Sequence, residues 1–434
     1  MKVREAAYLS LERCEKTDKF SNLELDSAIK KYGYIGADRA FFTTLVYGVI
    51  ERRITLDYVI SVYSSKPLEK IEPKLMNILR LGAYQILFLD RTPDSAAVNE
   101  SVELSKRYTH KGTSSFVNAV LRSIVRGKNN IPMPNEGSDE YLSVKYSLPT
   151  WLISLFRDNY GSDRVEGLLN GMNRSPSITL RVNTLKITKD ELIRSLNESG
   201  TDCSPSEKCD SAVMLTSNTA VSDLTVLHDG LCFVQDEASQ LCVKALGAKP
   251  NDFVIDTCSC PGGKSFGIAL EMGNAGRLIS LDLHESKLSL VENGAKKLGI
   301  EILKTEVHNG TKPNEELVGK ADRVLCDVPC SGLGVIAKKP DLRHKSPEDI
   351  ARLPEIQYKI LVNGASYLKD GGTLVYSTCT LNKAENEDVV NRFLNEHPEF
   401  SPCTDGMYEN KAMITFFPDT HGTDGFFVAK FVKK

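Results

Sequence analysis

From about residue 236 to its carboxyl end, the chain repeats one pattern: a short apolar run, a polar loop and a helix-forming segment. The apolar runs lie at 253–256, 277–282, 323–327, 371–377 and 425–432. Runs of this length, rich in β-branched and aromatic residues, are typical of strands. Strands that alternate with helices form a mostly parallel sheet with helices on both faces. This part of the sequence therefore predicts an α/β domain.

The amino-terminal third carries a different pattern. Apolar residues recur at helical spacing, for example in 41–50, 75–81 and 116–121, which indicates the core of a helical bundle. A stretch rich in Pro, Gly and Asn then reads as a linker, followed by a strand-like alternation at 177–183 and a helical pattern at 190–196. We predict an all-α domain at 1–130, a linker at 131–144, a small α+β subdomain at 145–235 and an α/β domain at 236–434.

The composition is that of an ordinary soluble protein, with 41% hydrophobic and 26% charged residues among 434. No apolar run approaches the roughly 20 residues that span a bilayer, and the first residues lack the apolar core of a signal peptide. We therefore expect a cytoplasmic protein without a membrane partner. Because 11 cysteines are an odd number in a large chain, a disulfide framework is not expected. No Cys-x-x-Cys or His-x-x-x-His accompanies them, so no metal is expected either.

The net charge of −3 hides an uneven distribution. The first 130 residues contain 21 lysines and arginines against 15 aspartates and glutamates. A basic amino-terminal third is compatible with a nucleic-acid partner.

The loop after the strand at 253–256 has the features of a ligand-binding loop. Pro261-Gly262-Gly263 gives a tight turn at which the backbone can approach a ligand closely. Asp282 ends the next strand, where a carboxylate can accept hydrogen bonds from ribose hydroxyls. The pair suits S-adenosylmethionine or NAD, and the missing Gly-x-Gly-x-x-Gly disfavours NAD. The phosphate-loop pattern fails because Cys258 stands where it needs glycine. The alternative is a plain strand-to-helix turn with Asp282 as a helix cap.

Two cysteines follow later strand ends, in Asp327-Val328-Pro329-Cys330 and in Ser377-Thr378-Cys379. Open α/β sheets bind ligands at this edge. A thiolate that attacks carbon 6 of cytosine makes carbon 5 nucleophilic toward a sulfonium methyl group, and a base must later remove the carbon 5 proton. Asp327 is suited to hold the amine and the protonated ring nitrogen of the base. Alternatively, both thiols are small buried hydrophobes, as we expect for Cys326 inside its strand, and Asp327 caps a turn.

Four basic residues follow Cys330 closely, namely Lys338, Lys339, Arg343 and Lys345. They indicate either phosphate contacts beside a target base or a solvated loop. Because attack on carbon 6 needs the face of the base, the target must be unpaired or flipped out.

At these residues the chain resembles the RNA cytosine-5 methyltransferases of the RsmB/Sun family, over nearly its whole length. The two cysteine segments, in this order and at this distance, are the specific part of the resemblance. The family's cofactor loop is matched at Cys258, Ser259, Cys260, Pro261, Gly262, Gly263 and Lys264, and its ribose-binding acid at Asp282. Ser259 and Cys260 replace two alanines that are usual there, and both are small enough for binding through the backbone.

The resemblance implies methyl transfer from S-adenosylmethionine to carbon 5 of a cytosine in small-subunit (16S) ribosomal RNA. It implies Cys379 as the nucleophile, Cys330 in product release, and Asp327 at the base and the cofactor. Asn309 stands where a carboxylate often contacts the adenine. The amino-terminal third resembles a NusB-like RNA-binding domain, and the segment around 180–183 resembles the family's small RNA-contacting subdomain.

Two other functions stay open at this point. One is a non-catalytic RNA-binding or assembly factor that has kept the sheet domain, against which Asp327, Cys330 and Cys379 together argue. The other is a thiol redox enzyme, which the missing Cys-x-x-Cys disfavours. The expected partner is small-subunit ribosomal RNA, with no obligate protein partner.

Overall fold

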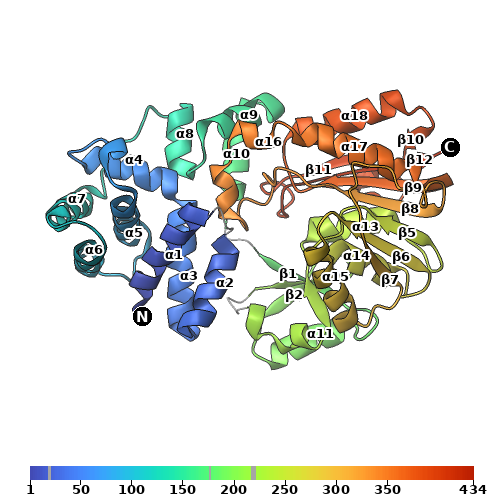
Figure 1. Ribbon diagram of the computed structural model, residues 1–434, viewed down its shortest axis with the longest axis horizontal. Coiled ribbons are helices and arrows are strands. Elements are labelled where there is room, and N and C mark those ends of the chain that lie inside the picture. The colour runs from blue at the N-terminus through green and yellow to red at the C-terminus, as the bar shows by residue number, and fades with distance from the viewer. Residues whose placement is uncertain (18–20, 175–176, 217–220) are drawn as a thin grey trace. The chain divides into compact units, whose positions relative to one another are not determined.

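The computed structural model describes residues 1–17, 21–174, 177–216 and 221–434 (Figure 1). The chain divides into two compact units. Unit 1 consists of Met1–Leu169 and Lys339–Lys345, and unit 2 of Asn170–Lys338 and Ser346–Lys434. None of the helices in the described ranges is both long and apolar enough to cross a membrane.

All regular secondary structure in the described residues of unit 1 is helical, which confirms the predicted fold class of this part of the chain. Its long helix α5 (Pro73–Phe88) buries all twelve residues from Leu75 to Ile86 and forms the centre of the core. The helices are α1 Val3–Thr17, α2 Ser21–Tyr32, α3 Gly36–Glu51, α4 Arg53–Tyr63, α6 Asp94–Tyr108, α7 Thr113–Gly127, α8 Asp139–Tyr146 and α9 Thr150–Tyr160, with the short η1 Leu68–Lys70. Helix α10, Ser162–Met172, spans the boundary with unit 2.

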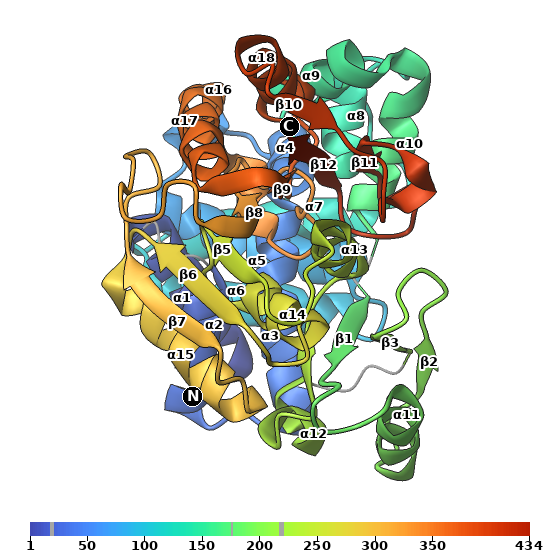
Figure 2. The same ribbon diagram turned by 90° about the vertical axis from the view of Figure 1, so that its right-hand side faces the viewer.

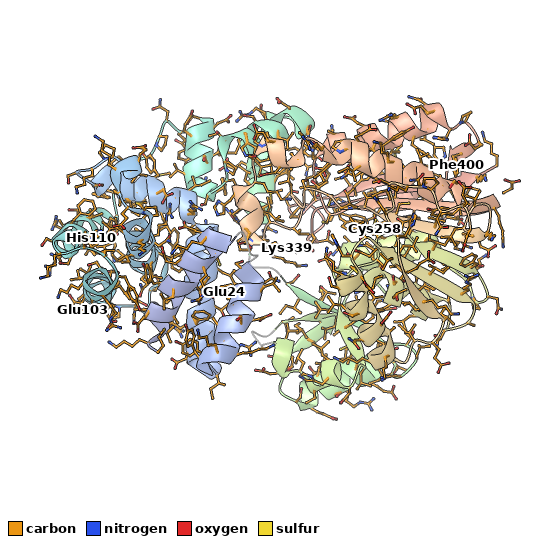
Figure 3. All side chains as sticks on the ribbon, in the orientation of Figure 1. Glu24, Glu103, His110, Cys258, Lys339 and Phe400 are labelled. Atoms are coloured by element: carbon orange, nitrogen blue, oxygen red, sulfur yellow. The ribbon has the colours of Figure 1, made fainter. Side chains whose placement is uncertain are left out.

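The segment Lys339–Lys345, which follows Cys330 in sequence, belongs to unit 1 and contains the short helix η3 (Pro340–His344). Figure 3 labels Lys339 at its start. Arg343 is 1% exposed, and its Nη1 donates to the carbonyl of Tyr146 at 2.9 Å. Ser21 Oγ donates to Asp341 at 2.6 Å. Neither a solvated loop nor a phosphate contact therefore describes Arg343, because its guanidinium satisfies buried backbone carbonyls.

Unit 2 contains a small antiparallel sheet of four strands in the order β2-β3-β1-β4. The strands are β1 Ile178–Val182, β2 Cys203–Pro205, β3 Ala212–Leu215 and β4 Cys232–Val234, with helices α11 Lys189–Glu198, η2 Val221–Asp223 and α12 Thr225–His228. Thr188 and Glu191 form a capping box that starts α11. The predicted α+β character of this region is confirmed.

The large sheet of unit 2 has eight strands, in the order β10-β12-β9-β8-β5-β6-β7, with β11 paired to β12. β5 to β9 run parallel, and β12 joins them antiparallel. The strands are β5 Phe253–Asp256, β6 Arg277–Asp282, β7 Leu303–Val307, β8 Ala321–Asp327, β9 Leu368–Thr378, β10 Phe400–Pro402, β11 Met413–Phe416 and β12 Phe426–Lys433. The chain moves outward from β5 to β7 and then restarts at β8 on the other side of β5, which makes a topological switch point there.

Alternate residues of these strands enter two separate cores. Figure 2 shows the helices that cover the two faces of the sheet. Val254 and Leu325 pack with α13 to α15 on one face, whereas Ile255 and Val324 pack with α17 and α18 on the other. The helices are α13 Glu237–Leu246, α14 Gly263–Glu271, α15 Glu285–Leu298, α16 Pro347–Ile350, α17 Leu353–Ser366 and α18 Glu387–Glu396, with η4 Lys383–Glu385 and η5 Tyr408–Asn410. The predicted mostly parallel sheet with helices on both faces is confirmed.

Candidate functional site

The predicted site residues gather at one edge of the large sheet, where β5, β6, β8 and β9 end. The loop 258–264 follows β5 (Figure 3 labels Cys258), and Asp282 is the last residue of β6. Asp327 ends β8, and Cys379 directly follows β9. β5 and β8 flank the switch point, where open α/β sheets bind their ligands.

The two thiols that the sequence singles out lie in contact. Cys330 Sγ and Cys379 Sγ are 3.2 Å apart, although 49 residues separate them in sequence. The backbone N–H of Cys379 also donates to Cys330 Sγ at 3.3 Å. Both side chains are half-buried. Cys326, by contrast, is fully buried inside β8, as predicted.

The proton affinity of Cys330 is strongly perturbed. Its hydrogen bond with Cys379 and its burial raise its pKa well above the usual value, and the negative charges of Cys379 and Glu385 act in the same direction. Cys330 therefore holds its proton tightly in this arrangement.

Asp327 is held by two side chains from different strand ends. Lys264 Nζ donates to one of its oxygens at 2.7 Å, and Ser377 Oγ donates to the other at 2.8 Å. Burial of Lys264 disfavours its charge, but the carboxylate of Asp327 outweighs this and raises the pKa of Lys264. The sequence predicted Lys264 only as part of the cofactor loop. Its partnership with Asp327, 63 residues away, left no signal in the spacing.

The chain beyond Cys330 packs closely against the Cys379 loop and the start of β12. Gly334 N donates to the carbonyl of Cys379 at 3.0 Å, and Gly425 N donates to the carbonyl of Gly334 at 2.9 Å. A Cβ atom on Gly334 would lie 1.9 Å from the carbonyl oxygen of Gly425. Only glycine fits at this position without movement of the main chain.

We therefore expect Gly334→Ala to lower the free energy of unfolding by about 1–3 kcal/mol, the usual range for overpacking. Urea unfolding followed by circular dichroism measures the change. Gly310→Ala is a matched control, because the added methyl would meet Ile360 at 3.4 Å, an ordinary contact. Equal stabilities of the two variants would contradict the close approach.

The residues around the cofactor loop fit S-adenosylmethionine. Gly262 has the left-handed φ of 109°, and a Cβ there would strike the ring of Phe266 at 2.4 Å. Gly263 is the first residue of α14. A Cβ atom at this position would meet Gln235 Nε2 at 3.7 Å, an ordinary contact, so the start of the helix is not crowded by other side chains. Backbone N–H groups at this helix start can therefore meet a ligand directly. Because Lys264 is bound to Asp327, this lysine is not available for the phosphate groups of a dinucleotide.

The ends of β6 and β7 supply the remaining predicted cofactor contacts. Asp282 is partly exposed, and one of its oxygens accepts from the backbone N–H of His284 at 3.0 Å. Leu283 and Val307 are 55% and 52% exposed, which leaves apolar surface beside this carboxylate for a flat base. Asn309 lies just beyond β7, and its side-chain oxygen accepts from Thr311 Oγ1 at 2.8 Å. Its contact with adenine stays a prediction.

Asp256 is a buried acid beneath the cofactor loop that sequence reasoning missed as a site feature. Ser265 Oγ donates to it at 2.6 Å, and Ser280 Oγ donates to Ser265 Oγ at 2.9 Å. Burial raises the pKa of Asp256 to about 7. Its place at a strand end was visible in the sequence, but its complete burial was not.

The raised pKa of Asp256 predicts a pH-dependent stability. Between pH values of about 3.8 and 7 the unfolded chain loses this proton while the native chain keeps it, so native stability falls as the pH rises. Asp256→Asn cannot titrate. We expect the unfolding free energy of the wild type to decline relative to this variant across that window, by at most about 1.4 kcal/mol per pH unit. Urea unfolding from pH 4 to 8 measures it, with the exposed Asp370→Asn as control. If the unfolding free energies of the wild type and Asp256→Asn changed with pH in parallel, titration of Asp256 in this window would be excluded.

Lys338, one of the four basic residues after Cys330, has internal partners. Lys338 Nζ lies 2.9 Å from Asp236 and 2.8 Å from Asp424. Asp236 in turn caps α13 by accepting from Ala238 N at 2.9 Å. Lys338 is therefore not the freely solvated charge of one alternative, and its contact with phosphate stays a prediction. Among the residues that the structure describes, no group of three or more His, Cys, Asp or Glu side chains could hold a metal ion.

A parallel sheet with a switch point, a glycine turn and a strand-end acid are features of nucleotide-binding α/β enzymes, a group that includes the S-adenosylmethionine-dependent methyltransferases. Residues 243–432 match the family described as 16S rRNA methyltransferase RsmB/F. Residues 1–126 match the NusB family, and residues 148–222 match the RsmF/B-like ferredoxin-like domain. The chain belongs to the RsmB family of 16S rRNA methyltransferases, and it uses S-adenosylmethionine as methyl donor.

Relatives match over the whole length of the chain. The probable ribosomal RNA small subunit methyltransferase B of Bacillus subtilis is 38% identical to this chain. The match covers 100% of this chain and 99% of the Bacillus protein. Ribosomal RNA small subunit methyltransferase B of Escherichia coli is 30% identical, with 92% and 91% covered. The crystal structure of the protein PH0851 is similar to this chain with a TM-score of 0.82 and 28% sequence identity, and the match covers 100% of this chain and 98% of that one.

Proposed function

We propose that this protein methylates carbon 5 of a cytosine in 16S ribosomal RNA through a covalent bond between Cys379 and carbon 6 of the base. The observation that carries the proposal is the contact of Cys330 Sγ and Cys379 Sγ, 3.2 Å apart, at the sheet edge that also presents Asp327. Covalent catalysis at carbon 5 needs one group that attacks and another that accepts a proton. Two adjacent thiols supply both.

Asp327 is suited to hold the base. Its oxygens already accept from Lys264 and Ser377, and each carboxylate oxygen has capacity for another hydrogen bond. The side chain is 26% exposed, so a cytosine edge can reach it. Accepting from the exocyclic amine and the protonated ring nitrogen withdraws electrons from carbon 6 and favours attack there.

The remaining steps follow from the chemistry of the two thiols. The Cys379 thiolate adds to carbon 6, and the electron pair of the 5,6 double bond moves to carbon 5. S-adenosylmethionine supplies the electrophilic methyl group that carbon 5 takes up. Cys330 then removes the carbon 5 proton, the double bond re-forms and the bond from sulfur to carbon 6 breaks. The Cys379 thiolate leaves, and the product is 5-methylcytosine.

RNA must present the cytosine outside a stacked helix, because the attack comes from the face of the base. The NusB-family part of unit 1 and its surplus of basic residues support an RNA-holding role for this unit.

The test is transfer of a labelled methyl group from S-adenosylmethionine to unmodified 16S RNA, both free and in partly assembled small subunits. Bisulfite sequencing then locates the modified base. We expect label at carbon 5 of a cytosine. A folded protein that binds the donor but labels neither form of the RNA, or labels another atom, would refute the proposal.

A further inference from the structure

Glu385, in η4, is a fully buried carboxylate beside the thiol pair. One of its oxygens accepts from the backbone N–H of Ser331 at 2.8 Å and from Gln357 Nε2 at 2.9 Å. The other accepts from Asn382 Nδ2 at 3.0 Å. All three donors are uncharged groups, namely a backbone N–H and two side-chain amides.

The same contacts fix the loop that carries Cys330. Ser331 is the residue after Cys330, and Gln357 Nε2 also donates to the carbonyl of Pro329, the residue before it, at 3.0 Å. Tyr376 OH, from β9, donates to the backbone carbonyl of Glu385 at 2.6 Å. Glu385 is therefore joined to both sides of Cys330 and to the strand that leads to Cys379.

The charges around the two thiols are unequal. The negative charge of Glu385 acts on Cys330 and favours its protonated form. The ammonium of Lys264 interacts with the charge of Cys379, which favours a thiolate there. The Tyr376 phenol also interacts electrostatically with Cys330, and the Asp327 carboxylate interacts with that phenol. Asp327 stands three residues before Cys330 and is paired with Lys264, whereas Glu385 contacts the Cys330 loop at the backbone N–H of Ser331.

We propose that Glu385 is a positioning residue that makes Cys330 the more basic of the two thiols, so that Cys379 attacks and Cys330 carries the proton. This inference rests on the proposed function. In the resting enzyme the proton shared by the pair lies on Cys330, and Cys379 is the thiolate. The less basic thiolate is also the better leaving group at the end of the reaction.

With Cys379 as the thiolate and Cys330 as the thiol, the protons balance over one catalytic cycle. Once Cys379 is bonded to carbon 6 it no longer carries charge, so the main cause that holds the proton on Cys330 disappears, and this proton passes to water. The Cys330 thiolate then accepts the carbon 5 proton as Cys379 leaves. The pair returns to its resting state, and one proton is released in each turnover, as replacement of C–H by C–CH₃ with a sulfonium donor requires.

The experiment measures the pH midpoint of alkylation of Cys330 by iodoacetamide, with the modified peptide quantified by mass spectrometry. It uses the full chain carrying Cys379→Ala, which removes the other thiol. We expect Glu385→Gln to lower the midpoint by about one pH unit or more, because a like charge is removed. Glu387→Gln is the matched control, since Glu387 accepts from Thr415 instead, and it should leave the midpoint unchanged.

Glu385→Asp separates charge from packing, because it keeps the charge and shortens the side chain. It should keep the midpoint high. An unchanged midpoint in a folded Glu385→Gln, or an equal fall in Glu385→Asp, would overturn the inference. If Glu385→Gln does not fold, competitive alkylation of the wild type at pH 8 decides: Cys379 should react first, and prior reaction of Cys330 would refute the assignment. No RNA is needed, so this result and the methyl-transfer result can fail separately.

Discussion

Cys379→Ala should abolish both methyl transfer and covalent attachment of the RNA, with a fall in kcat of roughly 10⁴-fold or more, as for other enzymes that lose their nucleophile. Alanine removes the sulfur that bonds to carbon 6, and without that bond carbon 5 stays unreactive. The Cys330 thiol remains, but the site then lacks a second thiol that could remove the carbon 5 proton. Labelled methyl transfer and a denaturing gel for the protein–RNA adduct measure the two losses.

Cys403→Ala provides the control for Cys379→Ala. Cys403 is also half-buried, and it follows β10, a strand apart from the loops that form the site. Its loss should leave turnover within about twofold, the effect of an ordinary substitution away from the chemistry. Substantial methyl transfer by folded Cys379→Ala would remove Cys379 from the mechanism.

Cys330→Ala should have the opposite effect on the adduct, which should accumulate. Cys379 can still attack and carbon 5 can still receive the methyl group. The proton on carbon 5 then has no base within reach, so the bond between sulfur and carbon 6 persists. Turnover should fall by on the order of 10²–10⁴-fold, the usual contribution of a general base. A band of protein bound to RNA that survives denaturation and contains labelled methyl groups is the expected observation.

The double variant Cys330→Ala/Cys379→Ala is the control for this adduct, and it should form none. Omission of S-adenosylmethionine should also prevent accumulation, because the addition is reversible until carbon 5 is methylated. If Cys379→Ala formed the adduct and Cys330→Ala did not, the roles assigned to the two thiols would be reversed.

The parts of the fold that local pattern determines could be predicted closely. β5 and β6 span the predicted residues 253–256 and 277–282, because buried parallel strands are short apolar runs bounded by polar loops. The segment Ser346-Pro347-Glu348-Asp349, with a capping residue and a proline in the first turn, predicts the start of one long helix, and this prediction is wrong in the length of the helix. Ser346 caps α16, but α16 ends at Ile350 and α17 starts at Leu353, because Pro354 lacks the N–H that a continuous helix would need.

The contacts that shape the site could not be predicted from spacing. Lys264 meets Asp327 across 63 residues, and Glu385 meets Ser331 across 54. Such pairs arise only when loops from different strands share one edge of the sheet. The sequence could place Cys330 and Cys379 at that edge, because each follows a strand of the same sheet. It could not show which charges border each thiol.

The number of basic residues after Cys330 was a poor guide to their role for a related reason, as Lys338 and Arg343 show. A count of lysines and arginines treats each as a solvated charge. Lys338 lies between two carboxylates, and Arg343 is buried against backbone carbonyls. Burial lowers the pKa of Arg343 to about 10. Neither is therefore the freely solvated charge that such a count assumes.

Because Lys339–Lys345 belongs to unit 1, the helical domain cannot be exchanged as one continuous segment of the chain. The helical unit is not encoded as one continuous stretch of the gene. A fragment ending at Leu169 would lack Arg343 and Asp341, and so would leave the carbonyl of Tyr146 and the hydroxyl of Ser21 without these partners. If the catalytic part were joined to a different amino-terminal domain, it would still contain Lys339–Lys345, which packs against the helices of unit 1. A substitution in the helical part near Tyr146 or Ser21 is therefore expected to affect this segment, and the reverse, because each supplies hydrogen-bond partners to the other.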